Sequence, residues 1–259
     1  MARWFGWRSV AWLSAAVLLA AWEIFARSGA VTPFMLPALS VVLERIASDA
    51  ASGELLQGLG LTLYRSLAGF AIAACAGILL GVLFVRSRMV RWWLDPIISV
   101  GFPMPKIAFL PIITLWLGFY DVSKISMIVF DAVFPVITAT IAGTMSVEKE
   151  LIWSARNLGA SERSLLWEVI LPASLPQLLT GLQVALPISL IVCIVAEMKM
   201  GGIGLGAAMM NATRFADSPG VFAGIVEIAL AGYALVKLME WIRHRLLRWH
   251  AEANDEAHA

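Results

Sequence analysis

Residues 154–197 read SARNLGASERSLLWEVILPASLPQLLTGLQVALPISLIVCIVAE, and this stretch decides the fold. Its second half, Leu175–Glu197, is an apolar run about as long as the roughly 20 residues that a helix needs to cross a bilayer. Its first half is polar and carries the start and stop signals of short helices. The stretch therefore predicts a spanning helix preceded by an ordered segment outside the membrane.

The composition of the whole chain agrees with a membrane protein. Of 259 residues, 60% are hydrophobic and 14% charged, whereas a soluble domain usually has about a quarter charged residues. Further apolar blocks long enough to span are Ser9–Ala26, Leu59–Val85, Ser123–Thr144 and Pro219–Trp241. The block at the N-terminus is long, and no small-x-small cleavage site follows it, so we expect a retained helix rather than a signal peptide.

Residues 92–120 are apolar but are broken by four prolines, which a straight helix does not accommodate. We expect a short interfacial helix at Met89–Val100, a break at 102–105, and a short spanning helix at Lys106–Gly118. The prediction is an all-α, polytopic membrane protein of about six transmembrane helices.

The distribution of basic residues sets the orientation. With the N-terminus in the cytoplasm, most Lys and Arg residues fall on the cytoplasmic side, as the positive-inside rule requires. An even number of spans then places both termini in the cytoplasm. Residues 36–49 form an amphipathic pattern that predicts a helix on the outer surface.

The polar loop, residues 147–172, is predicted to be a rigid elbow. Gly159 suits a left-handed helix stop, and Ser161 can cap a second helix with Glu162 in its first turn. Pro172 and Pro176 are expected to bend the chain back into the membrane. A soluble ATPase that changes shape needs such a stiff element to move membrane helices.

This loop resembles a family motif: E-A-A, three residues, G, nine residues, I-x-L-P. Ala155, Gly159, Val169 and Leu171-Pro172 stand at its positions, while Trp153 replaces the glutamate. The chain is similar to permease subunits of bacterial ATP-binding-cassette (ABC) importers, the binding-protein-dependent inner-membrane components. Within them it resembles the nitrate, sulfonate, taurine and bicarbonate group. Other matching segments include Pro105-Lys106-Ile107-Ala108-Phe109-Leu110-Pro111, Trp116-Leu117-Gly118 and Ala196-Glu197-Met198.

The resemblance implies a type I ABC importer permease fold in the bacterial plasma (inner) membrane. It also implies a second permease copy, with a homodimer expected, a cytoplasmic ATPase dimer that holds ATP and Mg²⁺, and an extracytoplasmic solute-binding protein. The lipid membrane surrounds these proteins. No further partner is expected, and binding to nucleic acid is not expected. The residues expected to couple to the ATPase are Ala155, Leu158, Gly159, Ala160, Ser161, Leu165, Val169, Leu171 and Pro172.

No enzyme function is predicted. The sequence lacks G-x-x-x-x-G-K-[ST], the loop that cradles ATP phosphates, and the glycine-rich residues 202–206 have no Lys-Ser/Thr after them. Cys75 and Cys193 lie in apolar blocks without metal-ligand spacing. We therefore expect no catalytic, cofactor-binding or metal-binding residues in this chain.

Charged residues at membrane depth are costly and need a reason. Arg65 and Glu23 lie near predicted helix ends, where snorkelling to the interface explains them. Asp131, Glu197 and Glu227 are the candidate residues of the substrate pathway. For Asp131, the alternative to a pathway role is a structural ion pair between helices, and the two are equally open. For Glu197, the alternative is a solvated helix end.

The expected cargo is a small solute of the sulfonate, taurine or nitrate type. If Asp131 and Glu227 line the path while ionised, a neutral, zwitterionic or cationic solute is the alternative. An ion-driven secondary transporter is the alternative from another class, although such a carrier has no need for the elbow. Residues 1–259 are predicted to form one transmembrane permease domain, with its core at about 57–245 and a disordered tail at 250–259.

Overall fold

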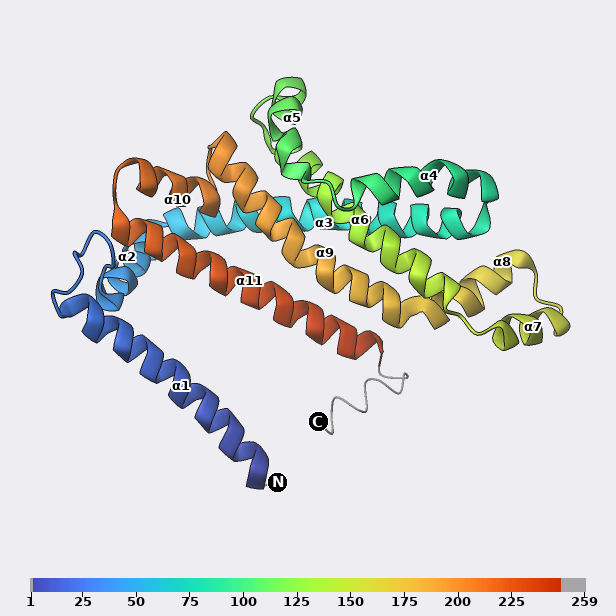
Figure 1. Cartoon of the computed structure of the whole chain (residues 1–259), viewed down its shortest axis with the longest axis horizontal. Helices are drawn as coiled ribbons and strands as arrows, with labels where there is room; N and C mark the ends of the chain where they lie inside the picture. Colours follow the sequence, from blue (N-terminus) through green and yellow to red (C-terminus); the bar gives the residue numbers. More distant parts are fainter. Residues whose placement is uncertain (1, 248–259) are drawn as a thin grey trace.

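The computed structural model describes residues 2–247, and side chains from residue 13 onward; within that range the chain is helical, without strands (Figure 1). The predicted tail at 250–259 lies outside these residues. The helices are α1 Ala2–Arg27, α2 Leu39–Ser52, α3 Glu54–Arg86, α4 Arg88–Gly101, η1 Lys106–Phe109, α5 Leu110–Leu117, α6 Asp121–Met145, α7 Lys149–Asn157, α8 Glu162–Ser164, η2 Leu165–Ile170, α9 Leu171–Met200, α10 Leu205–Arg214 and α11 Ser218–Leu246.

The core is the contact of α3 with α6, which glycines make possible. A Cβ atom at Gly77 would lie 2.7 Å from Val136, and one at Gly81 would lie 2.5 Å from Thr140. Such small residues let helix backbones approach closely in a membrane. Gly69 faces Ile128 in the same way, and the sequence separation is identical in all three pairs. Helices α3 and α6 therefore run parallel.

Parallel neighbours require a return crossing between them. Helix α4 packs against α3, and its last residue, Gly101, contacts Phe134 in the middle of α6. The segment Lys106–Leu117 then leaves at an angle of 95°. Helix α4 thus enters the bundle instead of lying along the surface, which corrects the predicted interfacial helix. The prolines thus separate the two arms of a bent pair, which has the form of a broken span or a re-entrant loop.

Four helices in the described range are long and apolar enough to cross a membrane: α3, α6, the continuous segment Glu162–Met200, and α11. Counted as one span, the bent pair brings this number to five. The predicted first span, Ser9–Ala26, is helical within α1, and α1 stands apart from the bundle in Figure 1. A sixth crossing by α1 remains a prediction.

Helix α9 runs antiparallel to α6. The two ends of the bundle differ in the elements that they carry. A Cβ at Gly143 of α6 would contact Gln177, whereas the earlier residue Ala139 meets Gly181. One end, which we call the hub end, carries α2, α10 and the starts of α3, α6 and α11. The opposite end, the loop end, carries α7 and α8 (Figure 1).

The helix is not interrupted at Pro172, and the bend expected from Pro172 and Pro176 remains a prediction. Residues Glu162–Met200 form one continuous helical segment, and Pro172 stands in the first turn of α9, where a missing N–H costs little. Just before it, residues Leu165–Ile170 form a wider π-helical turn, in which the N–H of Leu171 donates to the carbonyl oxygen of Leu166. A further turn of the chain lies at Gly159, between α7 and α8.

Candidate functional site: a docking loop and a buried polar hub

The loop end is organised by a helix stop and a helix cap. Gly159 adopts φ +87°, the left-handed conformation that glycine accepts most easily. The N–H of Ala160 donates to the carbonyl oxygen of Ala155 over 3.0 Å, which closes α7. The Ser161 hydroxyl then accepts a 3.2 Å hydrogen bond from the N–H of Ser164. Both predicted signals are confirmed, and they fix the angle between α7 and α8.

The two apolar residues expected to fill a partner's pocket differ sharply in exposure. Leu158 is 86% exposed at the tip of the loop, next to the Gly159 turn, but Leu165 is only 2% exposed. Leu165 belongs to η2, which packs against α7. It therefore stabilises the loop from inside and presents no surface to a partner.

Two tryptophans extend the exposed surface of the loop. Trp153, which stands at the motif's glutamate position, is 57% exposed, and Trp167 is 63% exposed. An ion pair of 3.0 Å between Arg156 and Glu162 links α7 with α8. The other predicted coupling residues, Val169, Leu171 and Pro172, continue from η2 into α9. The loop is thus a short, locally braced element that exposes three large apolar side chains, those of Trp153, Leu158 and Trp167.

The hub end has the opposite character, because Arg65 and Glu197 are buried there and paired with each other. Glu197 near the end of α9 is fully buried. Its carboxylate accepts hydrogen bonds from Arg65 Nη1 at 2.6 Å, from Thr62 Oγ1 at 2.9 Å and from the N–H of Gly206 at 3.1 Å. Arg65 also pairs with Asp121 at 2.7 Å. We call Thr62, Arg65, Asp121 and Glu197 the polar hub.

The glycine-rich segment 202–206 wraps around this hub. Close packing over the hub accounts for its glycines, and phosphate binding is not needed to explain them. Gly204 has φ +155°, and a Cβ there would lie 2.4 Å from the Glu197 carboxylate. The carbonyl oxygen of Ile203 accepts a 2.6 Å hydrogen bond from Arg65. Nearby, Lys124 donates to the carbonyl oxygen of Gly201 over 2.9 Å. The glycines are needed because the loop passes closely over a buried carboxylate.

The polar hub corrects two sequence-based interpretations. Arg65 does not snorkel, because it is 4% exposed and lies between two carboxylates. Glu197 is not a solvated helix end. Buried charges are tolerated where they are paired and hydrogen-bonded, and this arrangement joins α3, α6, α9 and the α9–α10 loop.

Asp131 also has a partner, which the sequence analysis did not identify. Its Oδ1 lies 3.1 Å from Lys106 Nζ in η1, at the break of the bent span. The ammonium group also donates to the carbonyl oxygen of Phe102 over 3.1 Å and lies 4.8 Å from the centre of the Phe134 ring. The signal for Lys106 was available, since a single lysine stands among prolines in an apolar block.

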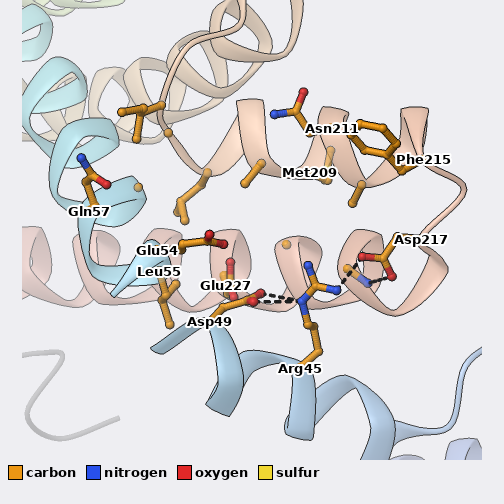
Figure 2. A pocket seen from close by; sticks show the side chains of 18 of the residues that line it. Arg45, Asp49, Glu54, Leu55, Gln57, Met209, Asn211, Phe215, Asp217 and Glu227 are labelled. Carbon is orange, nitrogen blue, oxygen red and sulfur yellow. Dashed lines mark hydrogen bonds and ion pairs between the residues drawn. The ribbon is translucent and has the colours of Figure 1, made fainter. Parts of the chain in front are cut away.

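Glu227 lines a cavity of about 400 Å³ at the hub end, between α2, α3, α10 and α11 (Figure 2). Figure 2 shows Arg45 between Asp49 and Asp217, with ion-pair distances of 2.9 and 2.6 Å. The hydrogen bond with Asp49 raises the pKa of the Arg45 guanidinium. The Oε1 atom of Glu227 is buried without a hydrogen-bond partner in the described part of the chain.

The structure therefore places the three candidate pathway carboxylates in three different surroundings. Glu197 lies in the polar hub, Asp131 in an ion pair at the broken span, and Glu227 in the wall of the cavity. Their assignment to a substrate pathway remains a prediction. Among the residues described, no group of three or more His, Cys, Asp or Glu side chains is arranged to hold a metal ion.

Comparison with known proteins agrees with this architecture. Residues 73–248 match the family described as binding-protein-dependent transport system inner membrane component. The taurine transport system permease protein TauC of Escherichia coli K12 is 35% identical over 92% of this chain and 88% of its own length. The putative aliphatic sulfonates transport permease protein SsuC of Bacillus subtilis 168 is 33% identical over 95% of this chain and 88% of its own length.

A crystal structure of an amino acid ABC transporter has the same fold. It superimposes with a TM-score of 0.63 at 17% identity and covers 77% of this chain and 97% of its own. This structure and the chain share the arrangement of their helices. The two permease sequences named above align with most of the chain. The chain therefore belongs to the family of binding-protein-dependent transport system inner membrane components, the permease subunits of ABC transporters.

Proposed function

We propose that this chain is one of two identical permease copies in an importer of small sulfonates, with residues 147–172 docked into a cytoplasmic ATPase dimer. ATP and Mg²⁺ bind to the ATPases, and an extracytoplasmic binding protein delivers the solute at the hub end. The loop end and both termini face the cytoplasm, as the basic residues of the loop end favour. The named substrates of the two relatives support the sulfonate class.

The exposed apolar loop is the observation that carries this proposal. The loop exposes Leu158 by 86%, Trp153 by 57% and Trp167 by 63%, and large apolar side chains gathered in one short element support a surface that a partner covers. The Gly159 turn and the Ser161 cap keep this surface in one shape. A stiff element of this kind can transmit the movement of the ATPases to α6 and α9, which flank the loop.

Alternating access follows from this coupling. Binding of ATP draws the two ATPases together, and the docked loops move with them. The ligand-free and ATP-bound states then differ in which end of the helix bundle is open, because each state makes different contacts with the loop.

The test is co-purification of the permease with its ATPase from native membranes. We expect Leu158→Glu to reduce the amount of bound ATPase at least tenfold, because a charge would enter the apolar contact. The matched control is Phe34→Glu, which changes a 64% exposed aromatic residue in the α1–α2 connection and should leave the ATPase bound. Equal retention of ATPase by both variants would show that the loop is not the docking element.

A further inference from the structure

The ion pair of Lys106 with Asp131 lies near the middle of α6, one of the helices long and apolar enough to cross a membrane. Asp131 is ten residues (131 − 121) after the start of α6, or about 15 Å along the axis at a rise of about 1.5 Å per residue. The hydrocarbon core of a bilayer is about 30 Å thick. The Lys106 side chain is 7% exposed and that of Asp131 is 24% exposed.

The open edge of Asp131 does not suit contact with lipid. Carboxylates within spanning segments face a water-filled space or the interior of an assembly. Its Oδ1 pairs with Lys106, while its Oδ2 has no partner among the residues that the structure describes. This oxygen is therefore available to a hydrogen-bond donor that arrives from a polar space.

The backbone beside the pair leads to the same conclusion. Residues 102–105 interrupt the span between α4 and η1, and irregular backbone at membrane depth occurs only where it is buried in protein or lines an aqueous cavity. Lys106 is the first residue after this break. A buried cation, a partly open anion and an interrupted helix thus meet at one place.

We propose that Lys106 and Asp131 form a membrane-depth site for a small zwitterion, in which Lys106 receives the anionic group and Asp131 the ammonium group. This inference rests on the proposed transport function. Binding would replace the ion pair of Lys106 with Asp131 by two ion pairs, one between each residue and the ligand. Because the residue pair and the zwitterion are both neutral, no net charge enters the membrane. A simple anion would take Lys106 and leave Asp131 ionised and unpaired.

The experiment uses the complete complex of permease and ATPase in nanodiscs, without the binding protein, so that its selectivity does not enter. Equilibrium binding is measured for taurine and β-alanine, and for ethanesulfonate and propionate, which lack only the amino group. We expect the zwitterions to bind at least tenfold more tightly than the matched anions. Asp131→Asn should remove most of this preference, and Lys106→Met should weaken all four ligands.

A double variant separates this site from a merely structural ion pair. Lys106→Met with Asp131→Leu leaves no unpaired charge, and we expect it to retain the ATPase and the wild-type melting temperature but to lose zwitterion binding and transport. Wild-type transport by the double variant would overturn the proposal, as would absence of any preference for the zwitterions in the wild type. Loss of ATPase association in the wild type would instead contradict the proposed function itself.

Discussion

The two ends of the bundle stabilise their loops by different means. At the hub end, Arg65 and Glu197 come from helices far apart in the sequence and are buried together. At the loop end, Gly159 and Ser161 act on residues only a few positions away, and Leu158 remains exposed. The difference indicates that the hub end forms part of the folded core, whereas the loop end is held by local contacts and leaves apolar side chains exposed, as the proposed docking requires. Substitutions at the hub end should therefore lower stability, and those at the loop end should alter association.

The largest effect is expected from Arg65→Met. The substitution leaves Glu197 fully buried without its cation, and loss of one partner of a buried pair costs about 3–5 kcal/mol. The melting temperature of the detergent-solubilised chain should fall strongly. Arg27→Met is the control, because Arg27 pairs with Glu23 at the surface with 65% of its side chain exposed. Similar melting temperatures for the two variants would contradict the core role of the hub.

Gly204→Ala should have the next largest effect. The new Cβ would lie 2.4 Å from the Glu197 carboxylate at a backbone conformation that alanine disfavours, and overpacking of this kind costs about 1–3 kcal/mol. Gly60→Ala is the matched control, since a Cβ there meets open space and should leave stability equal or slightly higher. If Gly60→Ala lowered stability and Gly204→Ala did not, the loop over Glu197 would not be tightly packed.

Gly159→Val should affect the loop end without lowering the melting temperature of the bundle. Valine disfavours the left-handed conformation at φ +87°, so the angle between α7 and α8 should change. We expect several-fold weaker ATPase association, measured by co-purification. Gly159→Asn should retain most of it, because asparagine enters this conformation more readily. Equal loss of ATPase association in both variants would mean that the partner needs a residue without a side chain at position 159, and not a particular backbone turn.

Ser161→Ala should have the smallest effect. Loss of the cap costs about 1 kcal/mol and should appear as faster hydrogen exchange at the N–H of Ser164, which bonds the Ser161 hydroxyl. Ser161→Asp should preserve slow exchange, because its carboxylate can accept the same bond. Unchanged exchange in the alanine variant would show that packing of Leu165, and not the cap, holds α8.

The same contrast explains which features the sequence predicts. Gly159 and Ser161 were recognisable because helix stops and caps depend on neighbouring residues. The burial of Arg65 was not, since its partner Glu197 lies on another helix and becomes a neighbour only after α3 and α9 pack. Pro172 leaves two outcomes open in the sequence, since proline is compatible with the first turn of a helix as well as with a bend. The apolar blocks predicted the long helices, and the proline cluster predicted the break but not the ion pair beside it.

The parallel alignment of α3 with α6 has a consequence for how the chain assembles during synthesis. Helix α6 reaches its place beside α3 only after residues 88–117 have crossed the bilayer in the opposite direction. That segment is interrupted by prolines and carries Lys106 at its middle, so it enters lipid less readily than the long apolar helices around it. The glycine contacts of Gly69, Gly77 and Gly81 must wait for this crossing, and the least lipid-compatible segment thereby sets when the tightest interface can form.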